Sequence, residues 1–200
     1  MAAPMSSLTC QKRVRFLCSV YAVFISTFPI LAFADYHFYS FSANDPRGIQ
    51  VSLNAFRGKP ALIVNVASEC GYTKSHYQDL VWLSQQPEID EKLHILAFPC
   101  NQFGQQEPAS DREILAHVQE TYGVAFPVFG KIDVLGKYAH PAYTYLINAS
   151  GKQPNWNFWK YLVDRQGRVI DAWGPSTSVR EIYGFLVAAT KTGSGRRDEF

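Results

Sequence analysis

The stretch "PALIVNVASECGYTKSHYQDLVWLSQQPEIDEKLHILAFPC", residues 60–100, decides the fold of this chain. It opens with "PALIVNVAS" (60–68), a continuous apolar run rich in β-branched residues, as expected of a strand buried on both faces. The segment "TKSHYQDLVWLSQQ" (73–86) has apolar residues at helical spacing and ends before Pro87. A second apolar run, "KLHILAFPC" (92–100), follows. This order predicts a β-α-β unit with parallel strands and a right-handed crossover.

A second helix is predicted over "ASDREILAHVQETYG", residues 109–123. Ser110 is its expected N-cap, Glu113 completes a capping box three residues later, and Gly123 ends the helix.

The C-terminal part predicts a hairpin and a closing helix. "NFWKYLVD" (157–164) and "RVIDAWG" (168–174) are strand-like and are joined through Gly167, which supplies the turn. "TSVREIYGFLVAATK" (177–191) has an apolar helical face. Together these elements predict one α/β domain over residues 35–192, a thioredoxin-like fold with a central mixed sheet flanked by helices.

The N-terminal residues 1–34 are typical of a secretory signal peptide. A basic segment (11–15) precedes residues 16–34, which carry no charge and end in Ala-Phe-Ala, so we expect cleavage before Asp35. The alternative is an uncleaved anchor in the membrane, because this uncharged run approaches the roughly 20 residues that cross a bilayer. After cleavage, no stable membrane insertion is expected.

The last residues, "GSGRRDEF" (193–200), predict a flexible tail. Its ending Arg-Asp-Glu-Phe is similar to the Lys-Asp-Glu-Leu retrieval signal of the endoplasmic reticulum, although an ordinary charged terminus is the alternative. With the signal peptide, this favours the lumen of the endoplasmic reticulum, the alternatives being secretion or a signal anchor in its membrane. Asn148, in Asn148-Ala149-Ser150, is a candidate glycosylation site in that compartment.

Composition narrows the classes of function. The chain is 47% hydrophobic, which suits one domain with its own core. Its formal charge of +2 becomes about −1 without the signal peptide, and with no basic run there is no reason to expect nucleic-acid binding. Only Cys70 and Cys100 remain after cleavage, too few for a disulfide framework. Redox chemistry is therefore favoured, and a single structural disulfide stays open.

Both cysteines are expected on one rim of the sheet, because each follows the carboxyl end of a predicted parallel strand. Cys70 lies at what we expect to be an exposed turn just before a helix N-terminus, which stabilises a thiolate. Glu69 opposes this effect with its negative charge. An inert, small apolar side chain is the alternative interpretation of Cys70, and it would fit a mid-strand position better. General disulfide exchange is disfavoured, because Thr73 stands where a C-x-x-C motif needs its second cysteine.

Three segments resemble the signature blocks of the glutathione peroxidase family in sequence, order and spacing: "NVASECG" (65–71), "FPCNQFGQQEP" (98–108) and "WNFWKYLV" (156–163). The resemblance covers roughly residues 36–190, and the segment 136–163 is most similar to the endoplasmic-reticulum members that carry cysteine in place of selenocysteine. It implies a thiol peroxidase that reduces hydrogen peroxide and, as further substrates, organic hydroperoxides.

The resemblance also implies the catalytic residues. Cys70 occupies the selenocysteine position, and Gln106, Trp156 and Asn157 match the other catalytic positions. Attack on peroxide turns the thiolate into a sulfenic acid, while amide and indole N–H groups stabilise the charge on the departing oxygen. Gln106 as a solvated loop residue and Trp156 as a core aromatic are the alternatives. Adjacent residues of a strand face opposite ways, so Trp156 and Asn157 can share one site only if a turn precedes the strand.

The reducing half of the reaction is implied by the same resemblance. Cys100 matches a cysteine thought to resolve the sulfenic acid, and we expect the disulfide to be reached by loop movement. Protein disulfide isomerase is the implied reductant, with glutathione weak because no basic cluster lies near the motifs. No metal and no other cofactor is expected. His76 is not expected to act as a catalytic base and is interpreted as a residue on the helix surface. We expect a monomer that supports oxidative protein folding and the response to oxidative stress. The alternatives are a redox-sensing interaction protein with little turnover and a fold without redox activity.

Overall fold

The computed structural model describes residues 36–192, which belong to one compact unit. The signal peptide predicted for residues 1–34 and the tail predicted for residues 193–200 lie outside the described residues. Within the described part of the chain, no helix is long and apolar enough to cross a membrane.

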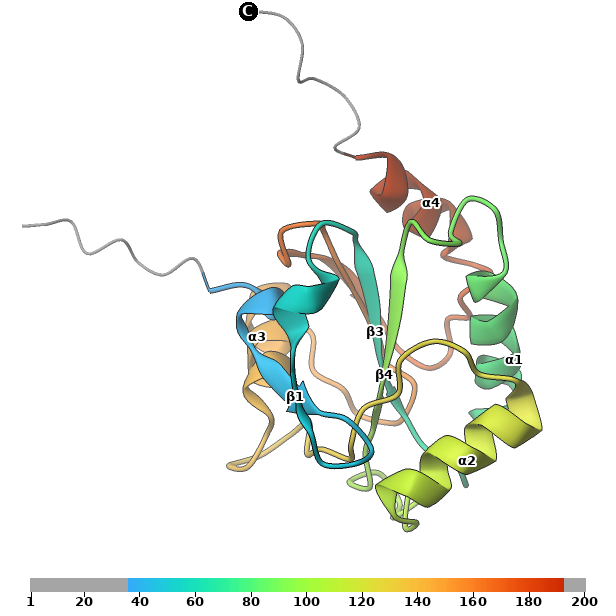
Figure 1. The fold of residues 1–200 in the computed structure, drawn as a ribbon. Helices are drawn as coiled ribbons and strands as arrows, with labels where there is room; N and C mark the ends of the chain where they lie inside the picture. The colour runs from blue at the N-terminus through green and yellow to red at the C-terminus, as the bar shows by residue number, and fades with distance from the viewer. Residues whose placement is uncertain (1–35, 193–200) are drawn as a thin grey trace, which may run out of the picture. The chain divides into compact units, whose positions relative to one another are not determined.

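A four-stranded mixed sheet in the order β4-β3-β5-β6 forms the centre of the domain (Figure 1). Strands β3 (Ala61–Val66) and β4 (His94–Pro99) pair in parallel, which confirms the predicted β-α-β unit. Strand β5 (Lys160–Val163) runs antiparallel to β3 and forms a hairpin with β6 (Val169–Trp173). Gly167 takes a φ of +87° in this hairpin, and a Cβ there would lie 2.8 Å from the ring of Tyr39, so glycine is required at the turn.

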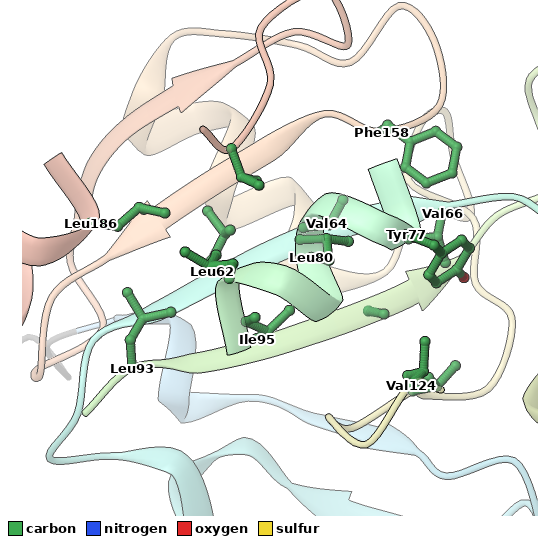
Figure 2. Close-up of a cluster of buried hydrophobic side chains, with 14 of the residues drawn as sticks. Leu62, Val64, Val66, Tyr77, Leu80, Leu93, Ile95, Val124, Phe158 and Leu186 are labelled. Atoms are coloured by element: carbon green, nitrogen blue, oxygen red, sulfur yellow. The ribbon is translucent and has the colours of Figure 1, made fainter. Parts of the chain in front are cut away.

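Helices α1 (Thr73–Ser84), α2 (Asp111–Tyr122) and α4 (Tyr183–Lys191) lie on one side of the sheet, to the right in Figure 1. They bury an apolar cluster against alternate residues of the central strands, which we call the α1-side cluster (Figure 2). Its members include Leu62, Val64, Val66, Tyr77, Leu80, Val118, Phe158, Leu162 and Leu186. The alternation of strand side chains thus separates two cores, one for each face of the sheet.

The opposite face carries the elements that the sequence did not predict. Helix α3 (Pro141–Ser150) packs there with the short hairpin of β1 (Ser42–Asn44) and β2 (Gln50–Ser52). Two 3₁₀ turns, η1 (Phe38–Ser40) and η2 (Leu53–Phe56), complete this layer. The buried residues of this face form the α3-side cluster: Phe38, Tyr39, Ala43, Leu53, Ala61, Ile63, Leu96, Phe98, Cys100, Tyr143, Leu146, Tyr161 and Val163, among others.

Helix ends follow the predicted capping chemistry at α2. The Ser110–Glu113 capping box forms, and Gly123 ends the helix with a φ of +71°. The closing helix is shorter than predicted, because residues 179–182 form turns and α4 begins only at Tyr183.

Candidate active site

Cys70 lies in a tight turn between β3 and α1 that Thr73 holds in place. The Thr73 hydroxyl donates to the carbonyl of Ala67 at 2.6 Å and accepts from the backbone N–H of Cys70 at 3.1 Å. Thr73 stands where a C-x-x-C motif would have its second cysteine. Its hydroxyl therefore fixes the turn that carries the Cys70 thiol. The turn is exposed as expected at Glu69, Gly71 and Tyr72, but the Cys70 side chain itself is only 8% exposed. This side chain points inward and packs in the α1-side cluster.

The Gln106 loop is joined to the Cys70 turn by main-chain and side-chain hydrogen bonds. The backbone N–H of Glu69 donates to the Gln106 carbonyl at 3.0 Å. Ser68 donates from its backbone N–H and from its hydroxyl to the Glu107 carboxylate. Gly104 takes a φ of +67°, and a Cβ there would lie 3.3 Å from Cδ of Gln106, so glycine leaves room for that side chain.

Glu107 was not singled out from the sequence, yet it is a fully buried carboxyl group in this part of the molecule. Burial raises its pKa to about 7, against the opposing effect of the Ser68 hydrogen bonds and of Lys131. The Lys131 ammonium donates to the Glu107 carbonyl at 2.7 Å, and Asn101 accepts from the Glu107 backbone N–H at 2.8 Å. Nothing in the sequence pattern distinguishes this residue from a solvated loop glutamate.

Replacing Glu107 with glutamine should remove a pH-dependent loss of stability. The native pKa of about 7 exceeds the ordinary 4.5, so the folded state holds a proton that the unfolded state releases. Stability of the wild type should therefore fall between about pH 4.5 and 7, by about 3 kcal/mol from this group. The glutamine keeps an acceptor and a donor for Ser68 without titrating.

Urea unfolding at pH 4.5, 5.5, 6.5 and 7.5 measures this difference. Glu120→Gln serves as the control, because it neutralises an exposed carboxylate without buried contacts. Glu113→Gln would be a poor control, because Glu113 takes part in the capping box of α2. A difference between the wild type and Glu107→Gln that stays constant over this pH range would show that Glu107 does not titrate as its burial requires.

Asn157 brings the third motif to the Gln106 loop. Its side-chain Nδ2 donates to Oε1 of Gln106 at 3.0 Å and to the carbonyl of Phe103 at 3.4 Å. Its Oδ1 is buried and has no hydrogen-bond partner in the described part of the chain. Trp156 is 37% exposed and its ring lies 6.3 Å from that of Phe103, between centroids. The turn expected before the strand is present, because residues 156–158 form a turn and β5 begins only at Lys160.

Cys100 follows β4 at the same end of the sheet as Cys70, but it packs on the other face. It is fully buried in the α3-side cluster, and both cysteines are free thiols. Burial raises the pKa of the Cys100 thiol. Its Sγ lies 3.8 Å from Oε1 of Gln102, and the same oxygen accepts the backbone N–H groups of Val134 and Leu135 at 2.8 and 2.9 Å.

His76 differs from its expected place on the helix surface. It is only 5% exposed, its Nε2 lies 2.9 Å from the carbonyl of Pro175, and its ring stacks on Phe158 at 4.9 Å. Burial, followed by the charge of Lys160, lowers its pKa to about 4. The segment before α4 covers this face of α1, a contact that the local sequence does not reveal.

Asn148, the glycosylation candidate, is exposed on α3. The hydroxyl of Ser150 in the same sequon donates to the carbonyl of Leu146 at 2.7 Å, so in the folded helix this serine is engaged with the backbone.

Comparisons with known proteins identify the family of this chain. Residues 38–147 match the family model described as glutathione peroxidase. Glutathione peroxidase 7 of Bos taurus is 55% identical over 145 residues, covering 72% of this chain and 77% of that protein. Probable glutathione peroxidase 8-B of Xenopus laevis is 47% identical over 145 residues, covering 72% and 69%.

Two solved structures show the same fold. The crystal structure of T. cruzi GPX1 superimposes with a TM-score of 0.64 at 33% identity, covering 78% of this chain and 97% of that one. A thiol:disulfide interchange protein of the thioredoxin family from Chlorobium tepidum TLS has a TM-score of 0.55 at 17% identity, covering 75% and 92%, which confirms the thioredoxin-like fold alone. The family match and the sequence identity to these relatives show the family as well as the fold. This chain therefore belongs to the glutathione peroxidase family.

Proposed function

We propose that this peroxidase uses Cys70 as its nucleophile and reduces hydrogen peroxide, with organic hydroperoxides as further substrates. The observation that carries the proposal is the hydrogen-bonded joining of three motifs at one end of the sheet. Glu69 and Ser68 tie the Cys70 turn to the Gln106 loop, and Asn157 bonds to the Gln106 side chain. A family whose members reduce peroxides with thiols supplies the reaction class.

In the proposed first step, the Cys70 thiolate attacks one peroxide oxygen and forms an S–O bond while the O–O bond breaks. Cysteine loses two electrons and becomes a sulfenic acid, and the departing oxygen takes a proton and leaves as water or an alcohol. Uncharged donors suit this step, because negative charge passes from sulfur to the departing oxygen. The Gln106 amide and the Trp156 indole N–H are such donors. Asn157 supports the first of them, because its Nδ2 donates to Oε1 of Gln106.

Cys100 is the proposed resolving thiol, which attacks the Cys70 sulfenic acid to form a disulfide and release water. The two side chains pack on opposite faces of the sheet, so this step requires the segment after β4 to leave its place. The side-chain amide of Gln102 makes three hydrogen bonds to the backbone of Val134 and Leu135. These bonds must break before the segment after β4 can move. This supports a disulfide reached by loop movement.

Protein disulfide isomerase is the proposed main reductant, with glutathione a weaker one. A surface hollow of about 610 Å³ lies beside the Cys70 turn, and its lining includes Glu69, Glu113 and His117. Two carboxylates there oppose the binding of glutathione, an anionic peptide at neutral pH, but not that of a dithiol protein. The family resemblance to endoplasmic-reticulum members supports the same choice.

The proposed compartment is the lumen of the endoplasmic reticulum, where the chain would work as a monomer and pass oxidising equivalents into protein folding. The signal-like N-terminus and the retrieval-like ending support this location. Asn148 is the proposed glycosylation site, and its exposure on α3 supports it.

Peroxide turnover with either reductant tests the proposal directly. Wild type with excess reduced protein disulfide isomerase should consume many equivalents of hydrogen peroxide, and consume them faster than with glutathione at equal thiol concentration. Cys100→Ser should lose most of this multiple turnover while keeping the first equivalent. Consumption of one equivalent followed by a stall in the wild type would instead favour the redox-sensing protein, and equal turnover by Cys100→Ser would remove the resolving role.

A further inference from the structure

Phe158 has a backbone conformation that its sequence does not favour. Its φ is +65°, in the left-handed region that bulky residues rarely adopt, and its side chain is fully buried. The ring stacks on His76 at 4.9 Å and meets Tyr77 edge-on at 5.9 Å, as Figure 2 shows for Tyr77. Such strain persists only where the surrounding structure imposes it, and it gathers at functional sites.

Asn65 makes four hydrogen bonds to the turn that contains Phe158. It is fully buried in β3. Its backbone carbonyl accepts the N–H of Phe158 at 2.7 Å, and its backbone N–H donates to the carbonyl of Trp159 at 3.3 Å. Its side chain adds two bonds, because Oδ1 accepts the Trp159 N–H at 3.0 Å and Nδ2 donates to the Trp156 carbonyl at 3.1 Å.

The side-chain bonds bracket the strained residue, one on each side of it in the chain. They require a donor and an acceptor a fixed distance apart, which a carboxylamide provides. Lys160 holds the same turn from the other face of the sheet, with its ammonium donating to the Phe158 carbonyl at 2.7 Å. Side chains alternate between the two faces along a strand. Asn65 therefore lies on the same face as Ile63, the α3 side, and Lys160 lies on the same face as Leu162, the α1 side.

We propose that Asn65 is a positioning residue of the peroxidatic site, whose amide fixes the turn so that Trp156 and Asn157 together serve Cys70. Without the two side-chain bonds, the turn can relax toward a regular strand, in which adjacent side chains face opposite ways. Asn157 would then lose its bond to Gln106. The inference rests on the proposed role of these residues in peroxide reduction.

The test compares Asn65→Asp with Asn65→Ala in the rate of Cys70 oxidation by hydrogen peroxide, as a ratio to wild type at each pH. At pH 7.5, an aspartate accepts from Trp159 but cannot donate to the Trp156 carbonyl, so we expect a loss of about 10- to 100-fold. Burial at this position raises the pKa of an introduced carboxyl group, so lowering the pH to 5 increases its neutral fraction. The neutral acid supplies both a donor and an acceptor, so the ratio for Asn65→Asp should rise. The ratio for Asn65→Ala should stay low at every pH.

Two charged or titratable groups border the turn in addition to the introduced acid. Lys160, whose pKa burial lowers to about 7, favours the charged aspartate, whereas His76, with a pKa of about 4, stays neutral over this range. His76 stays neutral in every variant, whereas Lys160 is coupled to a carboxyl group at position 65 only in Asn65→Asp. There it lowers the pKa of the introduced acid and moves the recovery of the ratio to lower pH. Asn155→Asp is the matched control, because Asn155 accepts only from the Trp159 indole at 2.8 Å and its ratio should stay near one.

A second readout does not depend on peroxide. The ¹⁵N–¹H signal of the Trp156 indole should shift in Asn65→Asp at pH 7.5 and return toward its wild-type position at pH 5. If the wild type fails to react with peroxide, the proposed function fails, while this signal still decides the positioning role. Wild-type rates for both Asn65→Asp and Asn65→Ala at pH 7.5, with an unchanged Trp156 indole signal, would overturn the inference. If Asn65→Asp does not fold at neutral pH, Asn65→Ala decides by its rate and its indole signal.

Discussion

Replacing Cys70 with serine should lower peroxide consumption to the uncatalysed background, a loss of at least about 10³-fold. Serine is nearly the same size and its backbone N–H can still donate to Thr73, so the turn should keep its shape. A hydroxyl group, however, cannot take the oxygen of a peroxide in a two-electron step as a thiolate does. The measurement is the decrease of hydrogen peroxide with excess reduced protein disulfide isomerase.

Cys100→Ser is the control for this experiment, since it removes the other free thiol among the described residues. It should still react with the first equivalent of peroxide at close to the wild-type rate, because Cys100 is buried on the other face of the sheet. Peroxide consumption by Cys70→Ser above background, with Cys100→Ser inactive in the first turnover, would assign the nucleophile to Cys100 instead.

The fold was predictable where local patterns carry the information. The strands β3 and β4 are continuous apolar runs, the capping box of Ser110 and Glu113 sets the start of α2, and Gly167 sets the hairpin. Helix α3 also has end signals, with Pro141 in its first turn and Gly151 at a φ of +67° after it.

The sequence motifs supply candidate residues for the site, but not the geometry around them. Cys70, Gln106, Trp156 and Asn157 follow from motifs, whereas the left-handed φ of Phe158 has no signal in the sequence. Its conformation depends on Asn65, which lies more than ninety residues earlier in the chain. The bond from Asn65 to Trp159, for example, joins residues 94 positions apart. The burial of Glu107 and His76 depends equally on segments far away in the chain. Long-range hydrogen bonds of buried polar groups are the part that local patterns cannot supply.

Replacing Gln106 with glutamate should slow the oxidation of Cys70 by about 10²- to 10³-fold, the usual cost of losing one donor to a developing oxyanion. The glutamate can still accept from Asn157, as the Gln106 Oε1 does at 3.0 Å. It loses the Nε2 donor and brings a negative charge to a step in which charge moves from sulfur to oxygen. The measurement is the second-order rate constant of the first oxidation, followed by loss of free thiol in the Cys100→Ser background.

Gln105→Glu is a closely matched control, because it introduces the same charge one residue earlier on an exposed side chain. Its φ of +55° is kept by glutamate as by glutamine, so the loop should not change. A large loss for Gln106→Glu with little change for Gln105→Glu would assign the effect to the donor that faces the reaction. If both variants lose the same factor, general electrostatic repulsion explains the loss and Gln106 is not a catalytic donor.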